Sequence, residues 1–258
     1  MEASTQLPGN RSLWQTTLGW QPNDQQLSLF QQLYDGILAA NQTLNLTRIT
    51  HPTDFWEKHL WDSLSGIAPW LGQPVNLPLD LNNRASGLAV IDIGTGGGFP
   101  GIPVAIACPN WSVTLLDSTQ KKMRFLQTLG QTLGLTHIAV VTERAEAVGH
   151  QPIHREAYDL ALIRAVGPAA TCAEYALPLL KPGGQAVLYR GQWSATETAA
   201  LNLAVSQLGG ELAQIYPWCT PITAGQRHCV VLNKTHRTLD KFPRAVGIPA
   251  KFPLTAME

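Results

Sequence analysis

An acidic residue followed by a glycine-rich turn carries the clearest chemical signal in this sequence. The stretch from residue 90 to residue 101 reads VIDIGTGGGFPG, in which an apolar run containing Asp92 is followed by five glycines within eight residues. Glycine lets the backbone approach a ligand closely, and a turn after the first strand of a parallel sheet lies at the edge where ligands bind. A turn that serves structure alone is the simpler alternative, but so many glycines are entropically costly for that purpose.

A dinucleotide is the first ligand class that such a loop could hold. Three glycines fit the dinucleotide spacing G-x-G-x-x-G, namely Gly96, Gly98 and Gly101. Asp117 follows at about the right distance to accept a ribose hydroxyl. The register counts against this ligand, because a strand ending near Ile93 makes Gly94 the first glycine of the turn, and the sixth position is then Phe99.

S-adenosylmethionine is the second ligand class. Its pattern, acid-x-G-x-G-x-G, is matched in register by Asp92, Gly94, Gly96 and Gly98. A pyrophosphate prefers helix N–H groups without a neighbouring carboxylate, whereas a sulfonium and an ammonium are stabilised by one. An acid at the mouth of the loop, as we expect for Asp92, therefore favours the methyl donor. Asp117 does not discriminate, since both ligands present a ribose diol.

The elements around the loop predict a parallel sheet covered by helices. Short β-rich runs alternate with longer helical stretches beyond residue 87, which is typical of such a sheet with helices on both faces. The predicted strands are Leu88–Ile93, Ser112–Asp117, Ile138–Val141, Asp159–Arg164, Gln185–Tyr189 and Cys229–Asn233. Predicted helices include Lys121–Leu133 and Ala169–Leu180, and Pro182-Gly183-Gly184 predicts a turn from helix to strand.

The first part of the chain is predicted to be helical. Apolar residues recur at helical spacing from Asp24 to Leu46, and a second helix is expected from Pro52 to about Leu71, with the proline in its first turn. Residues 72–87 lose all periodicity and gather proline, asparagine and glycine. We therefore expect an N-terminal helical extension (1–71), a linker (72–87) and a ligand-binding domain (88–258) with a basic C-terminal segment.

Composition excludes several classes of protein. Lysine plus arginine equals aspartate plus glutamate at 18 each, so no global charge draws the chain to a polyanion. The four cysteines show no spacing suited to zinc, which predicts reduced core thiols and no metal site. No apolar stretch suits a secretion signal or a membrane span. We expect a soluble, cytoplasmic protein.

Several motifs together resemble one family along nearly the whole chain. They read NLT (45–47), KHLWDSL (58–64), IDIGTGGGFPGIP (91–103), LLDSTQKKMRFL (115–126), ERAE (143–146), RAVG (164–167), LKPGG (180–184) and FPRAVGIPAKFPL (242–254). The glycine loop and LKPGG occur in many methyltransferases, but their combination with HLWDS and the C-terminal motif is specific. The sequence resembles the bacterial ribosomal RNA small subunit methyltransferase G family, also called glucose-inhibited division protein B.

The resemblance implies a fold, an activity and a binding site. The fold is the class I S-adenosylmethionine-dependent methyltransferase fold, a Rossmann-like, mostly parallel seven-stranded sheet with one antiparallel strand. The activity is methyl transfer from S-adenosylmethionine to guanine N7 in 16S ribosomal RNA, free or in the small ribosomal subunit, by an enzyme expected to be monomeric. The expected cofactor-binding residues are Asp92, Gly94, Thr95, Gly96, Phe99, Asp117, Ser118, Ala145, Glu146 and Arg164.

This chemistry requires no general base, because guanine N7 carries a free lone pair in neutral RNA. We expect catalysis by positioning and charge, from Arg164, Arg144 and Lys121. Motifs of two other methylation chemistries are missing from the sequence. The end of the fourth predicted strand reads RAVGP, not the Asn/Asp-Pro-Pro-aromatic motif that binds an exocyclic amino group, and the chain has no Pro-Cys dipeptide to supply a pyrimidine-attacking thiol. Methylation of amino groups and of pyrimidine C5 is therefore disfavoured.

The predicted RNA contacts are basic residues near the active edge of the sheet and near the C-terminus. They are Lys121, Lys122, Arg124, Arg244 and Lys251. Phosphate neutralisation by such side chains is the usual source of RNA affinity, although a solvated helix face is an equally simple explanation for the first three. His59 could face the active site, or be a partly buried helix residue.

Two other functions stay open at the level of sequence. A nicotinamide-dependent oxidoreductase would use the glycine loop for a dinucleotide. A ribosome-assembly module would bind RNA with a loop that no longer holds a donor.

Overall fold

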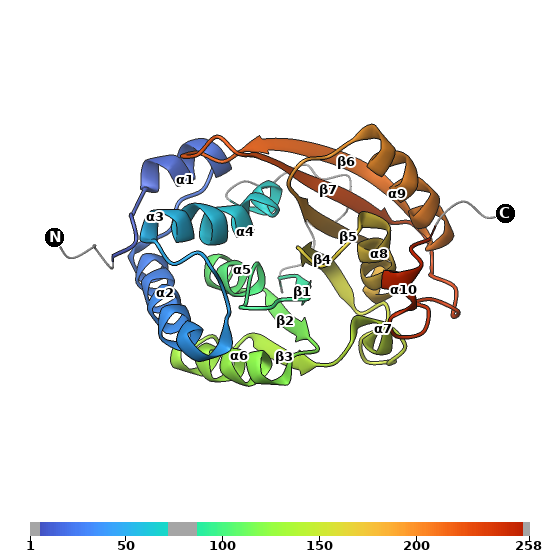
Figure 1. Cartoon of the computed structure of the whole chain (residues 1–258), viewed down its shortest axis with the longest axis horizontal. Coiled ribbons are helices and arrows are strands. Elements are labelled where there is room, and N and C mark those ends of the chain that lie inside the picture. Colours follow the sequence, from blue (N-terminus) through green and yellow to red (C-terminus); the bar gives the residue numbers. More distant parts are fainter. Residues whose placement is uncertain (1–5, 72–86, 255–258) are drawn as a thin grey trace.

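The structure is a computed structural model that describes residues 6–71 and 87–254, and it contains one seven-stranded sheet between two helical layers (Figure 1). The strands are Ala89–Ile93 (β1), Ser112–Asp117 (β2), Ile138–Thr142 (β3), Tyr158–Arg164 (β4), Leu180–Arg190 (β5), Gly210–Cys219 (β6) and Gln226–Lys234 (β7). The predicted linker 72–87 lies, apart from Gly87, outside the described residues.

The strand order is β3-β2-β1-β4-β5-β7-β6. The first five strands pair in parallel, and β7 runs antiparallel to both β5 and β6. The chain leaves β1 toward β2 and β3, then returns to β4 on the other side of β1. The carboxyl ends of β1 and β4 therefore flank the topological switch point, where ligands bind in sheets of this kind.

The six predicted strands are confirmed, as is the single antiparallel strand that the family resemblance implied. The sequence analysis did not locate β6. This strand lies at the edge of the sheet and its residues are half-buried or exposed, so it lacks the apolar run that marks the inner strands.

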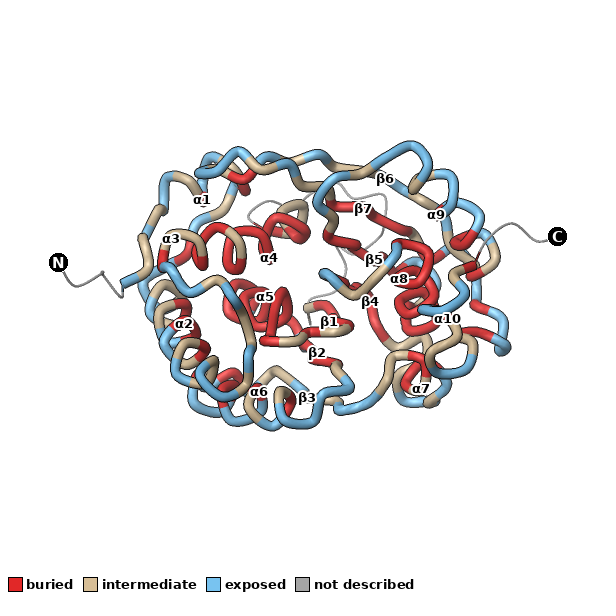
Figure 2. Tube along the Cα trace, viewed as in Figure 1, coloured by how far each residue is buried: buried red, intermediate tan, exposed pale blue. Residues whose placement is uncertain are grey.

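Helices cover both faces of the sheet. They are Arg11–Leu18 (α1), Asp24–Leu44 (α2), Pro52–Phe55 (α3), Asp62–Ser65 (α4), Gly101–Ala107 (α5), Gln120–Thr132 (α6), Ala145–Val148 (α7), Ala169–Ala176 (α8), Ala195–Gln207 (α9) and Ile248–Lys251 (α10). Val90 of β1 packs into the core beneath the layer of α2 to α6, whereas its neighbour Ile91 packs into the core beneath α8 and α9. In Figure 2 the buried residues follow α4, α5, α8 and the inner strands.

The helix from Pro52 contains a π-helical segment, Trp56–Trp61 (η1), between α3 and α4. The prediction that it extends to Leu71 is wrong. Regular helix ends at Ser65, and Ala68–Trp70 forms a short 3₁₀ turn around Pro69, which has no N–H to continue the helix. Segments of π-helix are rare and often occur at functional sites.

The prediction that Pro182-Gly183-Gly184 forms a turn between a helix and a strand is wrong. These residues lie within β5, where three extra residues bulge between the pairs Tyr158–Leu180 and Leu160–Gln185. The preceding helix α8 ends at Ala176 and is followed by the 3₁₀ turn Leu177–Leu179 (η4).

Two further expectations concern cysteines and membranes. Cys108, Cys172 and Cys229 are buried and free, as predicted for core thiols, but Cys219 is free and exposed. Among residues 6–71 and 87–254, no helix combines the length and the apolar character that crossing a bilayer requires.

Candidate active site

The glycine loop turns back over the ends of the first two strands. The amides of Gly94 and Thr95 both donate to the carbonyl of Leu116, at 2.8 and 3.0 Å. Gly94 has φ +73°, and a Cβ there would lie 2.5 Å from Cγ2 of Val166, so glycine suits both its backbone conformation and its close approach to the loop after β4.

Asp92 does not lie at the mouth of this loop, contrary to the sequence-based expectation. It is completely buried, and its Oδ2 accepts a hydrogen bond of 2.7 Å from the amide of Gly101. A Cβ on Gly101 would come within 2.8 Å of that same oxygen. Burial raises the pKa of Asp92 to about 6. The carboxyl group thus anchors the start of α5 from inside the protein.

Asp117 ends β2 beside the loop. Its Oδ2 accepts from the amide of Gly96 at 3.0 Å, and its Oδ1 accepts from the amide of Thr119 at 2.8 Å. The side chain is half-buried, so one carboxylate both shapes the glycine loop and faces the space in front of the sheet.

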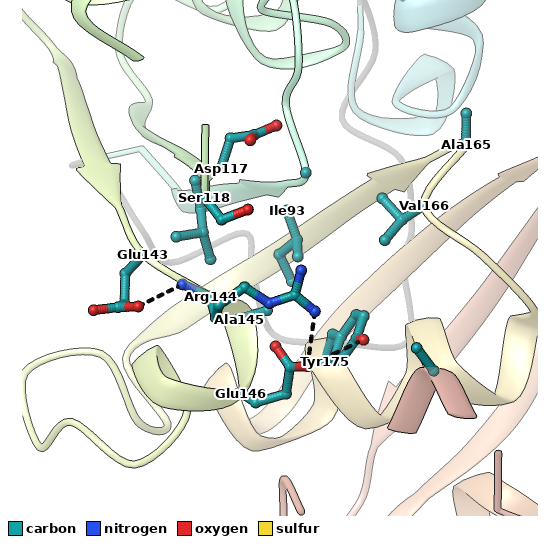
Figure 3. A pocket seen from close by; sticks show the side chains of 13 residues that line it. Ile93, Asp117, Ser118, Glu143, Arg144, Ala145, Glu146, Ala165, Val166 and Tyr175 are labelled. Atoms are coloured by element: carbon teal, nitrogen blue, oxygen red, sulfur yellow. Dashed lines mark hydrogen bonds and ion pairs between the residues drawn. The ribbon is translucent and has the colours of Figure 1, made fainter. Parts of the chain in front are cut away.

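The acidic cavity, as we name it, opens at the carboxyl ends of β1 to β4 and has a volume of about 350 Å³ (Figure 3). It is lined by Ile93, Gly94, Leu116, Asp117, Ser118, Glu143, Arg144, Ala145, Glu146, Ala165, Val166, Tyr175 and Ala250. The lining contains three carboxylates (Asp117, Glu143 and Glu146) and one guanidinium (Arg144), so it carries excess negative charge at neutral pH.

Glu146 is the most constrained side chain of the acidic cavity. It is 1% exposed, and its Oε1 accepts from Arg144 Nη2 and from the Gly247 amide, both at 2.9 Å, and from the Tyr175 hydroxyl at 3.3 Å. Burial by itself raises the pKa of Glu146, but the hydrogen bonds from Arg144 and Gly247 outweigh it and hold the pKa below its usual range. Its Oε2 is also buried and has no hydrogen-bond partner among the described residues.

A second cavity, which we name the basic cavity, has a volume of about 470 Å³. It is lined by Ile49, Lys58, His59, Asp62, Arg164, Ala165, Tyr189, Arg190, Gly191, Gln192 and Arg227. Four of these residues are lysine or arginine and one is acidic. Ala165 lines both cavities, so they meet at the loop that follows β4.

Arg164 is held rigidly at the wall of the basic cavity. Its Nη1 donates to Asp62 Oδ2 at 2.8 Å and to the Lys58 carbonyl at 2.9 Å. The other oxygen of Asp62 accepts from Arg227 Nε at 3.2 Å. Asp62 therefore orients two cations from distant strands, and Arg164 lies at the basic cavity and not among the residues that line the acidic one.

His59 contacts the guanidinium of Arg164 and is itself fixed by two neighbours. Its Nδ1 lies 3.3 Å from Arg164 Nη2, its Nε2 lies 2.7 Å from Thr47 Oγ1, and its ring stacks on Phe99 with centroids 4.4 Å apart. Because a guanidinium can only donate, Nδ1 accepts and the proton resides on Nε2. Burial, assisted by the charge of Arg164, lowers the pKa of His59 to about 3, so the ring is neutral at physiological pH.

The π-helical segment also holds the hairpin between β6 and β7. Buried Glu57 accepts hydrogen bonds from the amides of Ile222 and Thr223 at 2.5 and 2.9 Å, and from the Thr223 hydroxyl at 2.6 Å. This contact fixes the hairpin whose second strand carries Arg227. No pattern in the sequence pairs Glu57 with a segment 165 residues away.

The structure brings only part of the predicted site together. Gly94, Asp117, Ser118, Arg144, Ala145 and Glu146 line the acidic cavity. The described residues that line it do not include Asp92, Thr95, Gly96, Phe99 or Lys121. The Gly96 amide instead donates to Asp117, and the Phe99 ring stacks on His59. Seven lining residues were not predicted, and all but Tyr175 fall within the quoted motifs: Ile93, Leu116, Glu143, Ala165, Val166, Tyr175 and Ala250.

The predicted RNA contacts have varied environments. Lys121 and Arg124 are exposed on the first turns of α6 and Lys122 is half-buried, and none of the three is among the residues of either cavity. Lys251 is exposed. Arg244 instead makes a bidentate contact with buried Glu174, at 2.7 to 3.1 Å. No group of three or more metal-ligating side chains occurs within 6–71 and 87–254.

Comparison with known proteins identifies a family for this chain. The family model described as GidB, rRNA small subunit methyltransferase G, matches residues 26–229. A ribosomal RNA small subunit methyltransferase G from Trichormus variabilis is 54% identical over 248 residues, covering 96% of this chain and 98% of the relative. The protein of that name from Synechococcus elongatus is 52% identical over 246 residues, covering 93% and 95%.

Solved structures agree on the fold. The 16S rRNA (adenine(1408)-N(1))-methyltransferase from Catenulisporales acidiphilia superposes with a TM-score of 0.50 at 14% identity, covering 60% of this chain and 91% of that one. The expected class I methyltransferase fold is thereby confirmed.

Proposed function

Because the chain belongs to the GidB family of ribosomal RNA small subunit methyltransferase G proteins, we propose that it transfers a methyl group from S-adenosylmethionine to N7 of a guanosine in 16S ribosomal RNA. The observation that carries the proposal is the contact between an acidic and a basic cavity at Ala165. A cationic donor and a polyanionic acceptor need neighbouring sites of opposite charge.

The acidic cavity suits the donor. S-adenosylmethionine carries a sulfonium and an ammonium, and the lining offers Asp117, Glu143 and Glu146 against a single guanidinium. Glu146 Oε2 is a buried, charged acceptor that has no donor within residues 6–71 and 87–254, a costly arrangement that a ligand N–H group would relieve. Asp117 and Ser118 at the end of β2 would hold the ribose hydroxyls.

The basic cavity suits the target nucleotide. Its four cations would attract the phosphates of RNA: Lys58, Arg164, Arg190 and Arg227. Ala165 lies between this cavity and the donor site, and its side chain is short. The remaining predicted RNA contacts would reach more distant parts of the RNA, because they are cations outside both cavities: Lys121, Arg124 and Lys251, which are exposed, and Lys122, which is half-buried.

The residues of the site supply orientation and charge, and none of them needs to remove a proton. When bound, S-adenosylmethionine would supply an electrophilic sulfonium methyl group. The lone pair of guanine N7 would form the new N–C bond as the S–C bond breaks, leaving neutral S-adenosylhomocysteine and moving the positive charge to the methylated guanine. Neutral His59 keeps Arg164 in one orientation, and Asp62 prevents the two arginines from repelling each other. Placing two reactants in attack geometry contributes about 7–11 kcal/mol to such reactions.

A methyl-transfer assay tests the proposal. Purified protein is incubated with labelled S-adenosylmethionine and either unmodified small ribosomal subunits or naked 16S RNA, and the digested nucleosides are identified by mass. We expect label in 7-methylguanosine. Label in another nucleoside would contradict the target, and a fluorescence response to NADH without any response to S-adenosylmethionine would favour a nicotinamide-dependent oxidoreductase.

The proposed substrate also implies a location and a state. An enzyme that acts on ribosomal RNA works in the cytoplasm, and both cavities are formed within one chain, so we expect an active monomer. Light scattering during size-exclusion chromatography, at the concentration used for the assay, checks the monomer.

A further inference from the structure

The C-terminal segment, residues 242–252, lies against the acidic cavity. Figure 1 shows α10 packed beside α8, on the side of the sheet that also carries α7. The basic side chains of Arg244 and Lys251 predicted that this segment contacts RNA. In the structure this segment instead contacts buried residues of α7 and α8.

Arg244 fastens the segment to α8. Its guanidinium contacts both carboxylate oxygens of Glu174, which is completely buried, and its Nη2 also donates to the Phe252 carbonyl at 2.7 Å. One side chain thus joins both ends of the segment to the core. A guanidinium used in this way has few N–H groups left for a phosphate.

Two further anchors fix the middle of the segment. Buried Thr171 donates from Oγ1 to the Pro249 carbonyl at 2.9 Å, and His150 Nε2 lies 2.7 Å from the Pro243 carbonyl. The anchors come from α8 and from the turn after α7. The segment is therefore held by the same two elements that supply Tyr175 and Glu146 to the acidic cavity.

The segment reaches the acidic cavity at two points. The amide of Gly247 donates to Glu146 Oε1 at 2.9 Å, and Ala250 lines the cavity. The first contact fixes the carboxylate whose other oxygen is buried and unpaired among the described residues. The second places a small side chain where a larger one would take up ligand space.

We propose that the C-terminal segment is part of the donor-binding site, with Gly247 positioning Glu146, Ala250 forming one wall, and the Arg244–Glu174 pair holding both in place. This inference rests on the proposed function, since it concerns the site assigned to the methyl donor. It changes the role of Arg244 from an RNA contact to a positioning residue. Donor affinity then depends on a segment remote in sequence from the glycine loop.

The direct test compares two exposed alanines of the segment. Ala250→Phe introduces a ring at the cavity wall, whereas Ala245→Phe introduces the same ring at an exposed position outside the lining. The affinity of each purified full-length variant for S-adenosylhomocysteine is measured by calorimetry. We expect Ala250→Phe to lose at least about tenfold in affinity and Ala245→Phe to stay within about twofold of the parent.

A second pair of variants tests the anchor. We expect the adenine amino group of the donor to donate to Glu146. Arg244→Gln should therefore lower affinity for S-adenosylhomocysteine and reduce its preference over the deaminated, inosine-bearing analogue, because Glu146 is no longer held. The control is Arg237→Gln, which removes an exposed ion pair with Glu156. Thr171→Val removes a milder anchor and should show the same change if Arg244→Gln does not fold. Base preference separates positioning from a general loss of stability.

The outcomes distinguish this inference from the proposed function. If the parent binds S-adenosylhomocysteine and both Ala250→Phe and the anchor variants bind it equally well with unchanged base preference, the inference is overturned and the function stands. If the parent binds no donor product at all, both fail. Loss of affinity in Ala250→Phe but not in Ala245→Phe supports the inference.

Discussion

The acidic and basic cavities share Ala165 but are built in different ways. The acidic cavity is formed largely by residues that directly follow β1, β2, β3 and β4, together with Tyr175 and Ala250. The basic cavity joins the π-helical segment with β4, β5 and the start of β7, so its cations come from regions more than 100 residues apart. One cavity follows from strand order and the other from tertiary packing.

The cavities also handle charge differently. In the acidic cavity, Glu146 Oε2 is buried and has no hydrogen-bond partner among the described residues, and we expect it to accept a hydrogen bond from a ligand. In the basic cavity, both oxygens of Asp62 accept hydrogen bonds, one from Arg164 and the other from Arg227. The N–H groups of these arginines that do not contact Asp62 would be the ones to bind a ligand. A cationic donor and an anionic acceptor can then bind side by side without competing for one set of groups.

The largest expected effect separates the cavities through Arg164. Arg164→Ala should lower RNA methylation by roughly a hundredfold, as removal of one fixed cation or hydrogen-bond donor commonly does, while S-adenosylhomocysteine affinity changes little. Asp62 keeps Arg227 as a partner, so the protein should fold. Single-turnover methylation and calorimetry measure the two quantities, with Arg237→Ala as the control. An equal fall in donor affinity would contradict the separation of the two sites.

The reciprocal variant is Glu146→Gln. It keeps the size of the side chain but removes the charge, so donor affinity should fall about tenfold while RNA affinity stays unchanged. Calorimetry with S-adenosylhomocysteine and filter binding of 16S RNA provide the measurements. Exposed Glu211→Gln is the matched control. Weakened RNA binding in Glu146→Gln alone would show that the acidic cavity serves the acceptor.

Salt should act on one cavity far more than on the other. The logarithm of the RNA affinity should fall linearly with the logarithm of the salt concentration, because protein binding to phosphates releases counterions. Donor affinity in the partly enclosed acidic cavity should change little. Arg227→Ala should reduce the slope for RNA by about one ion. A titration of both ligands from low to high salt provides the data, and parallel slopes for the two ligands would argue against distinct sites.

The smallest effect concerns pH and His59. Its pKa of about 3 in the folded protein lies below the ordinary 6.5, so the ring stays neutral and the methylation rate should show no ionisation of His59 between pH 6 and 8. The unfolded chain binds this proton more readily. The corresponding stability is therefore present above pH 6.5 and is lost as the pH falls toward 3.

Denaturant unfolding at successive pH values measures this loss. His59→Gln should flatten the dependence of the unfolding free energy on pH in that range. A break in the methylation rate near pH 6.5 that disappears in His59→Gln would instead assign His59 a role in proton transfer.

The sequence predicted the acidic cavity better than the basic one for a physical reason. Asp117 and Glu146 follow consecutive strands, and parallel strands bring their carboxyl ends to one edge, so local pattern suffices to place them together. Arg164 also follows a strand, but its partners Asp62 and His59 are brought to it by the packing of the N-terminal helices. Spacing along the chain carries no information about that contact.

Asp92 shows a subtler limit. Its side chain shares a face of β1 with Val90, which packs under the layer that contains α5, and the Gly101 amide at the start of α5 receives it there. The acid-x-G-x-G-x-G pattern identified S-adenosylmethionine correctly. The expectation that the Asp92 carboxylate faces this ligand was wrong, because the carboxylate binds the Gly101 amide inside the protein. Likewise, the net positive charge of the C-terminal segment suggested RNA, but Glu174, which pairs with its Arg244, lies 70 residues away in sequence.

The most direct test of the two-cavity account is a crystal structure of the protein with S-adenosylhomocysteine and 7-methylguanosine 5′-monophosphate bound together. We predict the sulfur compound in the acidic cavity, with an N–H group on Glu146 Oε2, and the nucleotide in the basic cavity, with its phosphate near Arg190 or Arg227. The account would be contradicted by S-adenosylhomocysteine in the basic cavity, or by both molecules competing for the acidic one.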